Sequence, residues 1–245
     1  PPASRSEAGK RVVVIDAGHG GIDPGTQGRS GIREKDLVLN VAKELRRALE
    51  ATGRYRVQLT RDTDVFIPLR ERVNIARAAH AELIVSLHAD SNDHRDIRGA
   101  SVYTLSEDAS DREAATLAEK ENMSDVIAGV DLSGDNSPVA SILIDLAQRD
   151  TMNRSVRFAE RVLTVLPRAT MVRPTSPHRS AGFAVLKAPD IPAVLVELGY
   201  LSNSADEAEM AKSAWRVKVA GSLVAAIDGH FSAEAGLSGR QAAVP

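Results

Sequence analysis

The sequence contains no cysteine, which excludes disulfide bonds and thiolate metal ligands. Any metal ion bound by this protein must therefore be held by histidine, aspartate or glutamate side chains. Aromatic residues make up only 3% of the chain. This scarcity argues against the stacked aromatic platforms that bind single-stranded nucleic acid.

Long apolar runs and an excess of one charge are also missing. No apolar stretch approaches the roughly 20 residues that a membrane-spanning helix requires, so we expect no membrane span. The chain has 31 basic and 33 acidic residues and a net charge of −2, which gives no basic field for nucleic acid. Residues 1–9 lack the apolar core of a signal peptide and are expected to be a linker, so any export signal lies outside this sequence.

Strand-like and helix-like segments alternate along the chain. This order predicts an α/β fold in which a mostly parallel central sheet is flanked by helices. We expect residues 10–232 to form one domain and residues 233–245 to form a flexible tail. Strands are predicted at residues 12–16, 55–59, 83–88, 100–105, 183–186 and 193–197, and helices at residues 35–50 and after Pro68.

A long helical insertion, at about residues 106–181, interrupts the alternation. The pattern predicts one helix at about residues 111–128 and a second after Pro138, separated by a polar turn. Insertions of this length in a compact sheet protein are usually functional. Downstream, Ser204 and Glu207 have the spacing of a capping box and predict the start of one final helix.

Three polar side chains lie at or just beyond the carboxyl ends of predicted strands. His19 follows the first strand in a glycine-rich loop, His88 ends the third strand, and Glu197 ends the last one. Ligands of open α/β sheets bind at this edge. Glu34, at the start of the next helix, can reach the same edge if the loop from Gly20 to Gly31 folds back.

Each residue also has an ordinary structural interpretation. A single histidine after a strand is most often a hydrogen-bonded loop residue, and Glu34 alone would be a helix N-terminal acid. Glu197 is harder to explain, because a buried carboxylate is costly unless it is ligated, paired or catalytic. Together, two histidines and a carboxylate form a zinc set with an open position for water, and a second carboxylate would supply the general base. We interpret the other histidines as solvated: His80, His94, His178 and His230.

The chain resembles the zinc-dependent N-acetylmuramoyl-L-alanine amidases of bacterial cell division. Four blocks carry the resemblance in family order: residues 15–21 (IDAGHGG), 33–36 (REKD), 86–90 (SLHAD) and 196–203 (VELGYLSN). The resemblance implies one zinc ion per chain, with His19, Glu34 and His88 as ligands and Glu197 as the catalytic acid/base. It also implies a monomeric periplasmic enzyme that cleaves the amide between N-acetylmuramic acid and L-alanine of peptidoglycan during daughter-cell separation.

The insertion is similar to the regulatory insert of the same family at residues 117–125 (LAEKENMSD). By position, the resemblance makes Glu121 an autoinhibitory ligand that takes the place of water at the zinc. It implies an activator protein that docks on about residues 131–166. From the residues alone, Glu119 and Glu121 would be solvated acids on a helix rich in glutamate and lysine.

Two further functions remain open from the sequence. A non-catalytic wall-binding protein could retain this fold, although it would have no need for the full set of His19, Glu34, His88 and Glu197. A zinc hydrolase could also act on another bond, such as a peptide or an acetamide. The fragments released from purified peptidoglycan distinguish these possibilities.

Overall fold

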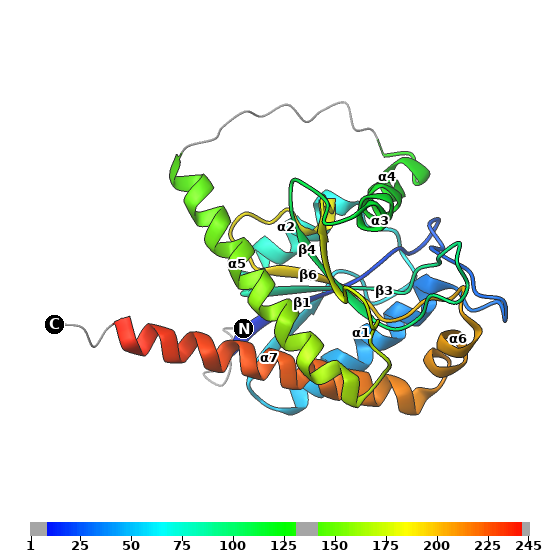
Figure 1. Cartoon of the computed structure of the whole chain (residues 1–245). Helices are drawn as coiled ribbons and strands as arrows, with labels where there is room; N and C mark the ends of the chain where they lie inside the picture. The colour runs from blue at the N-terminus through cyan, green and yellow to red at the C-terminus, as the bar shows by residue number, and fades with distance from the viewer. Residues whose placement is uncertain (1–8, 131–141, 242–245) are drawn as a thin grey trace.

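The computed structural model describes residues 9–130 and 142–241. Its centre is a six-stranded sheet with strand order β2-β1-β3-β6-β4-β5, shown in Figure 1. Strands β1, β2, β3 and β6 are parallel, whereas β4 pairs antiparallel to β6 and parallel to β5. The strands are β1 Arg11–Ala17, β2 Tyr55–Leu59, β3 Leu83–His88, β4 Ser101–Leu105, β5 His178–Ala181 and β6 Ala193–Glu197.

Helices cover both faces of this sheet (Figure 1). On one face lie α1 Glu34–Ala51, α5 Ile142–Val165 and α7 Ser213–Gln241, which contribute to one apolar cluster. The other face carries α2 Leu69–Ala78, α3 Arg112–Asn122 and the 3₁₀ turn η2 Ala184–Leu186, which contribute to a second cluster. The remaining elements are α4 Ser124–Ile127, α6 Ser204–Met210 and the 3₁₀ turn η1 Leu166–Arg168. The predicted α/β class with a mostly parallel, helix-flanked sheet is confirmed.

Alternation along the strands decides which side chains reach which face. Val13 and Ile15 of β1 belong to the first cluster, and Val12 and Val14 belong to the second. Successive side chains of a strand point to opposite faces, so a buried strand needs apolar residues at every position. The β-branched run at the start of the chain meets this need, and β1 is buried from its second residue onward.

The insertion supplies helices and one edge strand. The two predicted helices correspond to α3 with α4 and to α5, but β5 lies where we expected helix or turn. The predicted strand at residues 183–186 is wrong. Those residues form the turn η2 against α2, because β5, at the edge of the sheet, has already taken the place beside β4. The predicted turn at residues 131–137 lies outside the described residues, as do residues 1–8.

The C-terminal part of the chain differs from expectation in three ways. The single final helix is two helices, α6 and α7, and Asn203 caps α6 by accepting from the backbone N–H groups of Ala205 and Asp206. Helix α7 continues to Gln241, beyond residue 233, where we expected a tail to begin. His230 is buried against Phe158 rather than solvated. No helix in the described parts of the chain is long and apolar enough to cross a membrane.

A buried ion pair holds the end of β1 in place. Arg72 of α2 contacts Asp16 at 2.8 Å, and its guanidinium also donates to the backbone carbonyls of Ala17 and His19. Burial raises the pKa of Asp16, but Arg72 and the hydroxyl donors Ser86 and Thr60 outweigh it and lower that pKa to about 2. Because the pKa of Asp16 is depressed, this stabilisation is fully present above the ordinary pKa of 3.8 and is lost as the pH falls through about 2.

We predict that Arg72→Met lowers the free energy of unfolding by about 3–5 kcal/mol at neutral pH, because it leaves the Asp16 carboxylate buried without its cation. The matched control is Arg77→Met on the same helix, whose ion pair with Asp190 is exposed and should contribute no more than about 1 kcal/mol. Urea unfolding at neutral pH measures both. Equal losses for the two variants would contradict the role given to Arg72.

Candidate metal centre

The strand register brings the predicted site residues to one edge of the sheet. Strands β1, β3 and β6 are parallel neighbours, so their carboxyl ends lie together. His88 and Glu197 are directly paired in the β3–β6 register. By alternation with Ile84 and Leu195, both side chains point to the face that α3 covers. His19 follows β1 by two residues and reaches the same place.

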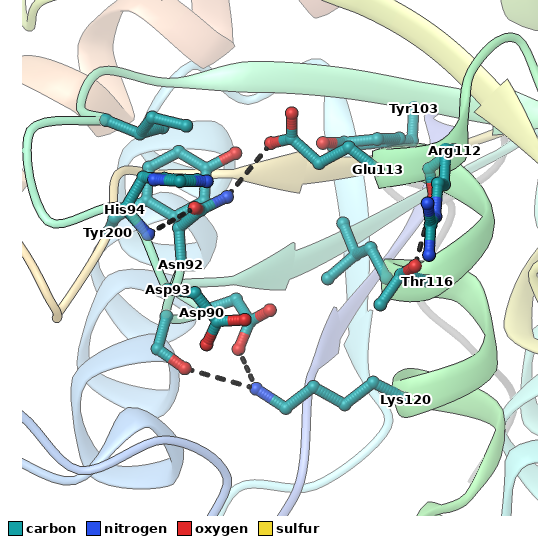
Figure 2. A pocket seen from close by; sticks show the side chains of 13 residues that line it. Asp90, Asn92, Asp93, His94, Tyr103, Arg112, Glu113, Thr116, Lys120 and Tyr200 are labelled. Atoms are coloured by element: carbon teal, nitrogen blue, oxygen red, sulfur yellow. Dashed lines mark hydrogen bonds and ion pairs between the residues drawn. The ribbon is translucent and has the colours of Figure 1, made fainter.

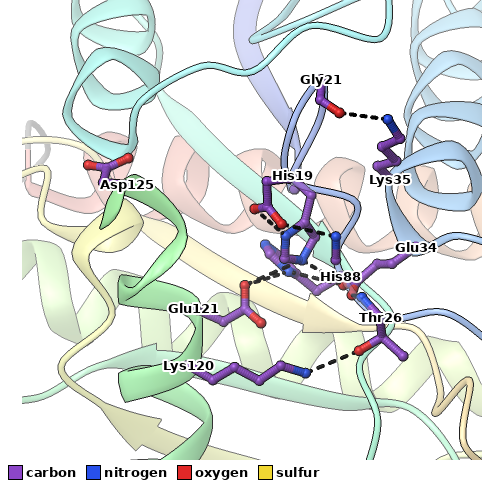
Figure 3. A network of polar contacts seen from close by, with 12 residues as sticks. His19, Gly21, Thr26, Glu34, Lys35, His88, Lys120, Glu121 and Asp125 are labelled. Carbon is purple, nitrogen blue, oxygen red and sulfur yellow. Dashed lines mark hydrogen bonds and ion pairs between the residues drawn. The ribbon is translucent and has the colours of Figure 1, made fainter. Parts of the chain in front are cut away.

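His19, Glu34 and His88 form a compact group that could hold a metal ion. His19 Nε2 lies 3.1 Å from Glu34 Oε1, and His88 Nδ1 lies 3.3 Å from the same oxygen. Figure 3 shows the three side chains converging from the β1 loop, the start of α1 and the end of β3. All three are buried, Glu34 completely. The loop from Gly20 to Gly31 thus folds back as the sequence reasoning required.

The donor atoms of this group are those that a metal ion would use. Among the described residues, His19 Nε2 and His88 Nδ1 are buried and have no hydrogen-bond partner. Buried polar atoms are normally paired, so two unpaired ring nitrogens around one carboxylate oxygen require an explanation. A bound cation provides it, because imidazole nitrogen and carboxylate oxygen are the ligands available to zinc in a chain without cysteine. The residues present therefore fit a metal centre.

Hydrogen bonds behind the group fix its orientation. His19 Nδ1 lies 2.8 Å from Asp23 Oδ2, which leaves Nε2 directed at Glu34. Glu34 itself accepts from the backbone N–H groups of Thr26 and Ala89. A carboxylate behind a ligating histidine selects its tautomer and increases its basicity. The β1 loop is therefore built to present one ring nitrogen.

Two positions in this loop need glycine because other groups approach closely. A Cβ atom on Gly18 would lie 2.4 Å from His88 Cε1, and one on Gly25 would lie 2.7 Å from both His19 Cδ2 and Glu34 Oε2. His19 adopts a positive φ of 59° and is held there by Arg72, which donates to its carbonyl. Such strained conformations occur where the surroundings over-determine them, often at functional sites.

The electrostatics of the group favour positive charge. Burial lowers the pKa of His19, but Glu34 and Glu121 outweigh it and raise that pKa to about 10. The same two carboxylates raise the pKa of His88 against its burial. Burial opposes ionisation of Glu34, yet the histidines lower its pKa well below the ordinary value. The carboxylates around the two imidazoles therefore favour positive charge at this place, which a divalent cation would bring.

Glu197 has the environment of a proton-transfer group. It is fully buried, and Oε2 accepts from the backbone N–H of Asp90 at 3.0 Å. Its other oxygen, Oε1, has no partner among the described residues. Burial raises the pKa of Glu197 well above its ordinary value; His88 opposes this, and Asp90, Glu34 and Glu121 add to it. A buried carboxyl group with a raised pKa can both accept and deliver a proton near neutral pH.

The inserted helix α3 places Glu121 against both histidines. Glu121 Oε2 lies 3.1 Å from His88 Nδ1 and 3.5 Å from His19 Nε2, as Figure 3 shows. Glu121 is buried, whereas Glu119 is exposed, so the solvated interpretation holds for Glu119 and is wrong for Glu121. The buried face of α3 comprises Ala114, Leu117, Ala118 and Glu121, the i, i+3, i+4, i+7 spacing of an amphipathic helix.

Several residues of the site were not predicted from the sequence. Asp23, behind His19, belongs to a loop whose fold no periodicity reveals. Lys120 forms an ion pair with Asp90 and also donates to Thr26 at 3.1 Å, which ties α3 to the sheet edge. The residue pattern carried one usable signal: Glu121 lies in the same helical stripe as Leu117 and Ala118, which favours burial.

A family model described as N-acetylmuramoyl-L-alanine amidase matches residues 13–229. N-acetylmuramoyl-L-alanine amidase AmiC of Escherichia coli O6:H1 (strain CFT073) is 40% identical over 230 residues, which cover 94% of this chain and 55% of that protein. N-acetylmuramoyl-L-alanine amidase AmiA of Escherichia coli (strain K12) is 38% identical over 231 residues, covering 94% of this chain and 79% of that protein. The chain thus spans little more than half the length of the first relative.

Solved structures show the same fold. The catalytic domain of CwlV, an N-acetylmuramoyl-L-alanine amidase from Bacillus (Paenibacillus) polymyxa var. colistinus, is similar with a TM-score of 0.63 and 26% identity, covering 91% of this chain and 98% of that chain. N-acetylmuramoyl-L-alanine amidase AmiC2 of Nostoc punctiforme gives the same TM-score, identity and coverage.

We predict that Asp23→Asn weakens divalent metal binding by about 10- to 100-fold, because it removes the charge that orients and polarises His19. Asp62→Asn, at an exposed loop position, is the matched control and should bind metal like the parent. Metal content after dialysis against graded chelator measures the effect. If the Asp23 variant keeps its metal as firmly as the control, Asp23 does not support the ligand.

Proposed function

This chain belongs to the N-acetylmuramoyl-L-alanine amidase family, and from that membership we propose that it is a zinc-dependent hydrolase of peptidoglycan. Its substrate would be the amide between N-acetylmuramic acid and the L-alanine of the stem peptide. The observation that carries the proposal is the buried group of His19, Glu34 and His88, with its unpaired ring nitrogens, beside Glu197.

In this proposal His19, Glu34 and His88 hold the zinc. Bound there, zinc would lower the pKa of water and polarise the scissile carbonyl. Glu197 takes the proton of the attacking water on Oε1, the oxygen with no partner among the described residues, and then delivers it to the leaving amine of L-alanine. The backbone N–H of Asp90 holds Oε2 and so keeps the other oxygen directed at the reaction.

We further propose that α3 keeps the enzyme inactive. Glu121 Oε2 contacts the same two ring nitrogens of His19 and His88 that Glu34 contacts, so it would take the position that the attacking water needs. An anionic carboxylate competes well with neutral water for a divalent cation. The ion pair of Lys120 with Asp90 adds to the attachment of α3. Activity would require α3 to leave this position.

An activator protein would remove α3 by docking on the insertion, at about residues 131–166. Residues 131–141 of this region lie outside the described residues, and so do the side chains of Ile142, Leu143 and Leu146. The described part of α5 is anchored to the body, since Phe158, Ala159 and Val162 are buried in the first apolar cluster. The proposed setting is the periplasm, where the enzyme separates daughter cells.

The first experiment digests purified sacculi with the parent chain and with Glu197→Gln. Under the proposal, the chain carrying Glu121→Ala, which lacks the blocking carboxylate, releases intact stem peptides with a free L-alanine amine, and chelator stops the release. Glu197→Gln in this background should lower the rate about 10²- to 10⁴-fold, because it removes general acid–base catalysis. Mass spectrometry identifies the fragments, and metal analysis should show undiminished zinc.

The matched control is Glu209→Gln, at an exposed position of α6, in the same Glu121→Ala background. It should digest sacculi at the rate of the chain that carries Glu121→Ala alone. Fragments cut at another bond would leave a zinc hydrolase of different specificity. Absence of any release from the chain carrying Glu121→Ala would favour the wall-binding alternative. Loss of zinc from the Glu197 variant would show that Glu197 acts as a ligand instead.

Removal of the Glu121 carboxylate tests the autoinhibition. We expect Glu121→Ala to raise basal hydrolysis of sacculi by about 5- to 150-fold, the usual range of a regulatory coupling. Glu119→Ala, two residues away on the exposed side of the same helix, is the control and should leave the rate unchanged. Dye release from labelled sacculi gives both rates. If Glu121→Ala hydrolyses sacculi no faster than the parent, Glu121 does not block the site.

A further inference from the structure

A cavity of about 580 Å³ lies between α3 and the loop that follows β3. Asp90 and Lys120 line it at one end, and Glu113 and Arg112 line it at the other, as Figure 2 shows. Asp90 is the residue whose backbone N–H contacts Glu197, so the cavity starts beside the catalytic carboxylate of the proposed reaction. Its volume is in the range of small-ligand sites.

The far end of this cavity holds a carboxylate bound by three side chains. Glu113 Oε1 accepts from Asn92 Nδ2 at 3.1 Å and from Arg173 Nη1. Glu113 Oε2 accepts from Arg173 Nη2 at 2.9 Å and lies 2.9 Å from Arg179 Nη1. We call Asn92, Arg173 and Arg179 the carboxylate cradle. Its pairing with Arg173 is bidentate, the geometry in which guanidinium recognises carboxylate most specifically.

The cradle belongs to the body of the protein, whereas Glu113 belongs to α3. Arg179 lies on β5 and is anchored by donating to the Ser176 carbonyl, and Arg173 Nη1 also contacts Tyr200 Oη at 3.2 Å. The side chains of Arg173 and Arg179 are only 11% and 6% exposed, against 32% for Glu113. Both arginines are thus nearly buried and belong to the body, whereas Glu113, the carboxylate that they bind, belongs to α3.

The charges of the cluster match this arrangement. Burial opposes ionisation of Glu113, but hydrogen bonds from Arg173 and Arg179 outweigh it and lower its pKa. The hydrogen bond to Glu113 raises the pKa of Arg173. Glu113 and Arg173 therefore each favour the charged form of the other. One exposed ion pair would be enough to attach the end of α3 to the body. The cradle instead provides two nearly buried arginines and an amide for a single carboxylate.

Departure of α3, which the proposed function requires, would leave two nearly buried guanidinium groups without their acid. Unpaired charges in such a recess are costly, so binding of another anion in place of Glu113 would be favoured. Glu113 and Glu121 are eight positions apart on α3, which corresponds to roughly 12 Å along the helix. Three to four extended residues span that distance. The carboxyl group of N-acetylmuramic acid is consumed in the scissile amide, so any free carboxylate near this bond belongs to the peptide beyond L-alanine.

We propose that Asn92, Arg173 and Arg179 bind a stem-peptide carboxylate of the substrate, and that Glu113 occupies this subsite while α3 is in place. The inference rests on the proposed amidase function and adds to it the part of the substrate that is recognised. Glu113 thus stands for the substrate carboxylate in the structure described.

The test compares two soluble muramoyl peptides, one with free peptide carboxylates and one with those carboxylates amidated. The enzyme is the full chain carrying Glu121→Ala, loaded with zinc. We expect kcat/KM to be about tenfold or more higher for the free acid, because each hydrogen bond between charged groups contributes a factor of this order. Arg173→Gln and Arg179→Gln should remove this preference by slowing the free acid alone. Arg154→Gln, which alters an ion pair with Glu234 far from the cavity, should keep it.

A binding measurement covers variants that fold poorly or turn over slowly. Glu113→Gln removes the competing negative charge from the cradle without changing an arginine, so the free stem peptide should bind this variant about tenfold or more tightly than it binds the parent, as measured by calorimetry. Amidated peptide should bind both chains equally. If the stem peptide with free carboxylates binds the parent and Glu113→Gln equally tightly, the proposed carboxylate subsite is wrong.

The two proposals fail in different ways. Equal hydrolysis of free and amidated substrates, with the arginine variants slowing both alike, overturns the cradle and leaves the amidase intact. Absence of hydrolysis of either substrate, together with tighter binding of the acid to Glu113→Gln, supports the cradle and counts against the amidase.

Discussion

The parallel register of β1, β3 and β6 is the constraint on which the rest of the site depends. It sets His88 directly beside Glu197 and delivers the β1 loop to the same edge. A shift of one residue in β3 would turn His88 to the opposite face, because side chains alternate along a strand. The buried hydroxyl of Ser86 on β3 donates to Asp16 of β1 at 2.6 Å, a contact that such a shift would break, and the Asp16–Arg72 ion pair holds the loop that carries His19. The packing of these strands and the geometry of the site therefore depend on the same strand register.

This register also concentrates negative charge. Glu34, Glu121 and Glu197 are all buried around two histidines, and burial of several carboxylates in one place is unfavourable unless cations offset it. Their effects on the surrounding groups agree: the pKa values of His19 and His88 are raised, and the pKa of Glu197 is raised as well. A divalent cation would relieve this repulsion. The carboxylate that is least anchored to the sheet is Glu121, since it comes from the inserted helix.

Sequence patterns predicted the elements whose burial follows a simple period. Strands β2, β3 and β6 begin and end where alternation and turn residues placed them, and the polar ends of β3 and β6 revealed His88 and Glu197. Prediction failed where distant contacts decide the outcome. Phe183–Leu186 is apolar enough for a strand, but β5 had filled that position in the sheet. The carboxylate cradle was invisible because Asn92, Arg173 and Arg179 come from separate segments and only the β4–β5 pairing and the following loops bring them to Glu113.

The composition of α3 agrees with its proposed removal from the site. Its apolar face offers little more than Ala114, Leu117 and Ala118, so burial of apolar surface contributes modestly to its attachment. Three charged residues add ion pairs, Glu113 at the cradle, Lys120 at Asp90 and Glu121 at the histidines, and Asn122 adds hydrogen bonds to the backbone of Gly182 and Ala184. Each charged residue contacts a group that the proposed reaction needs, namely the peptide-binding arginines, the residue beside Glu197 and the metal ligands. Under the proposed function, release of the helix and exposure of a complete active site would therefore be the same event, and substrate and metal would replace the three charged contacts that the helix gives up.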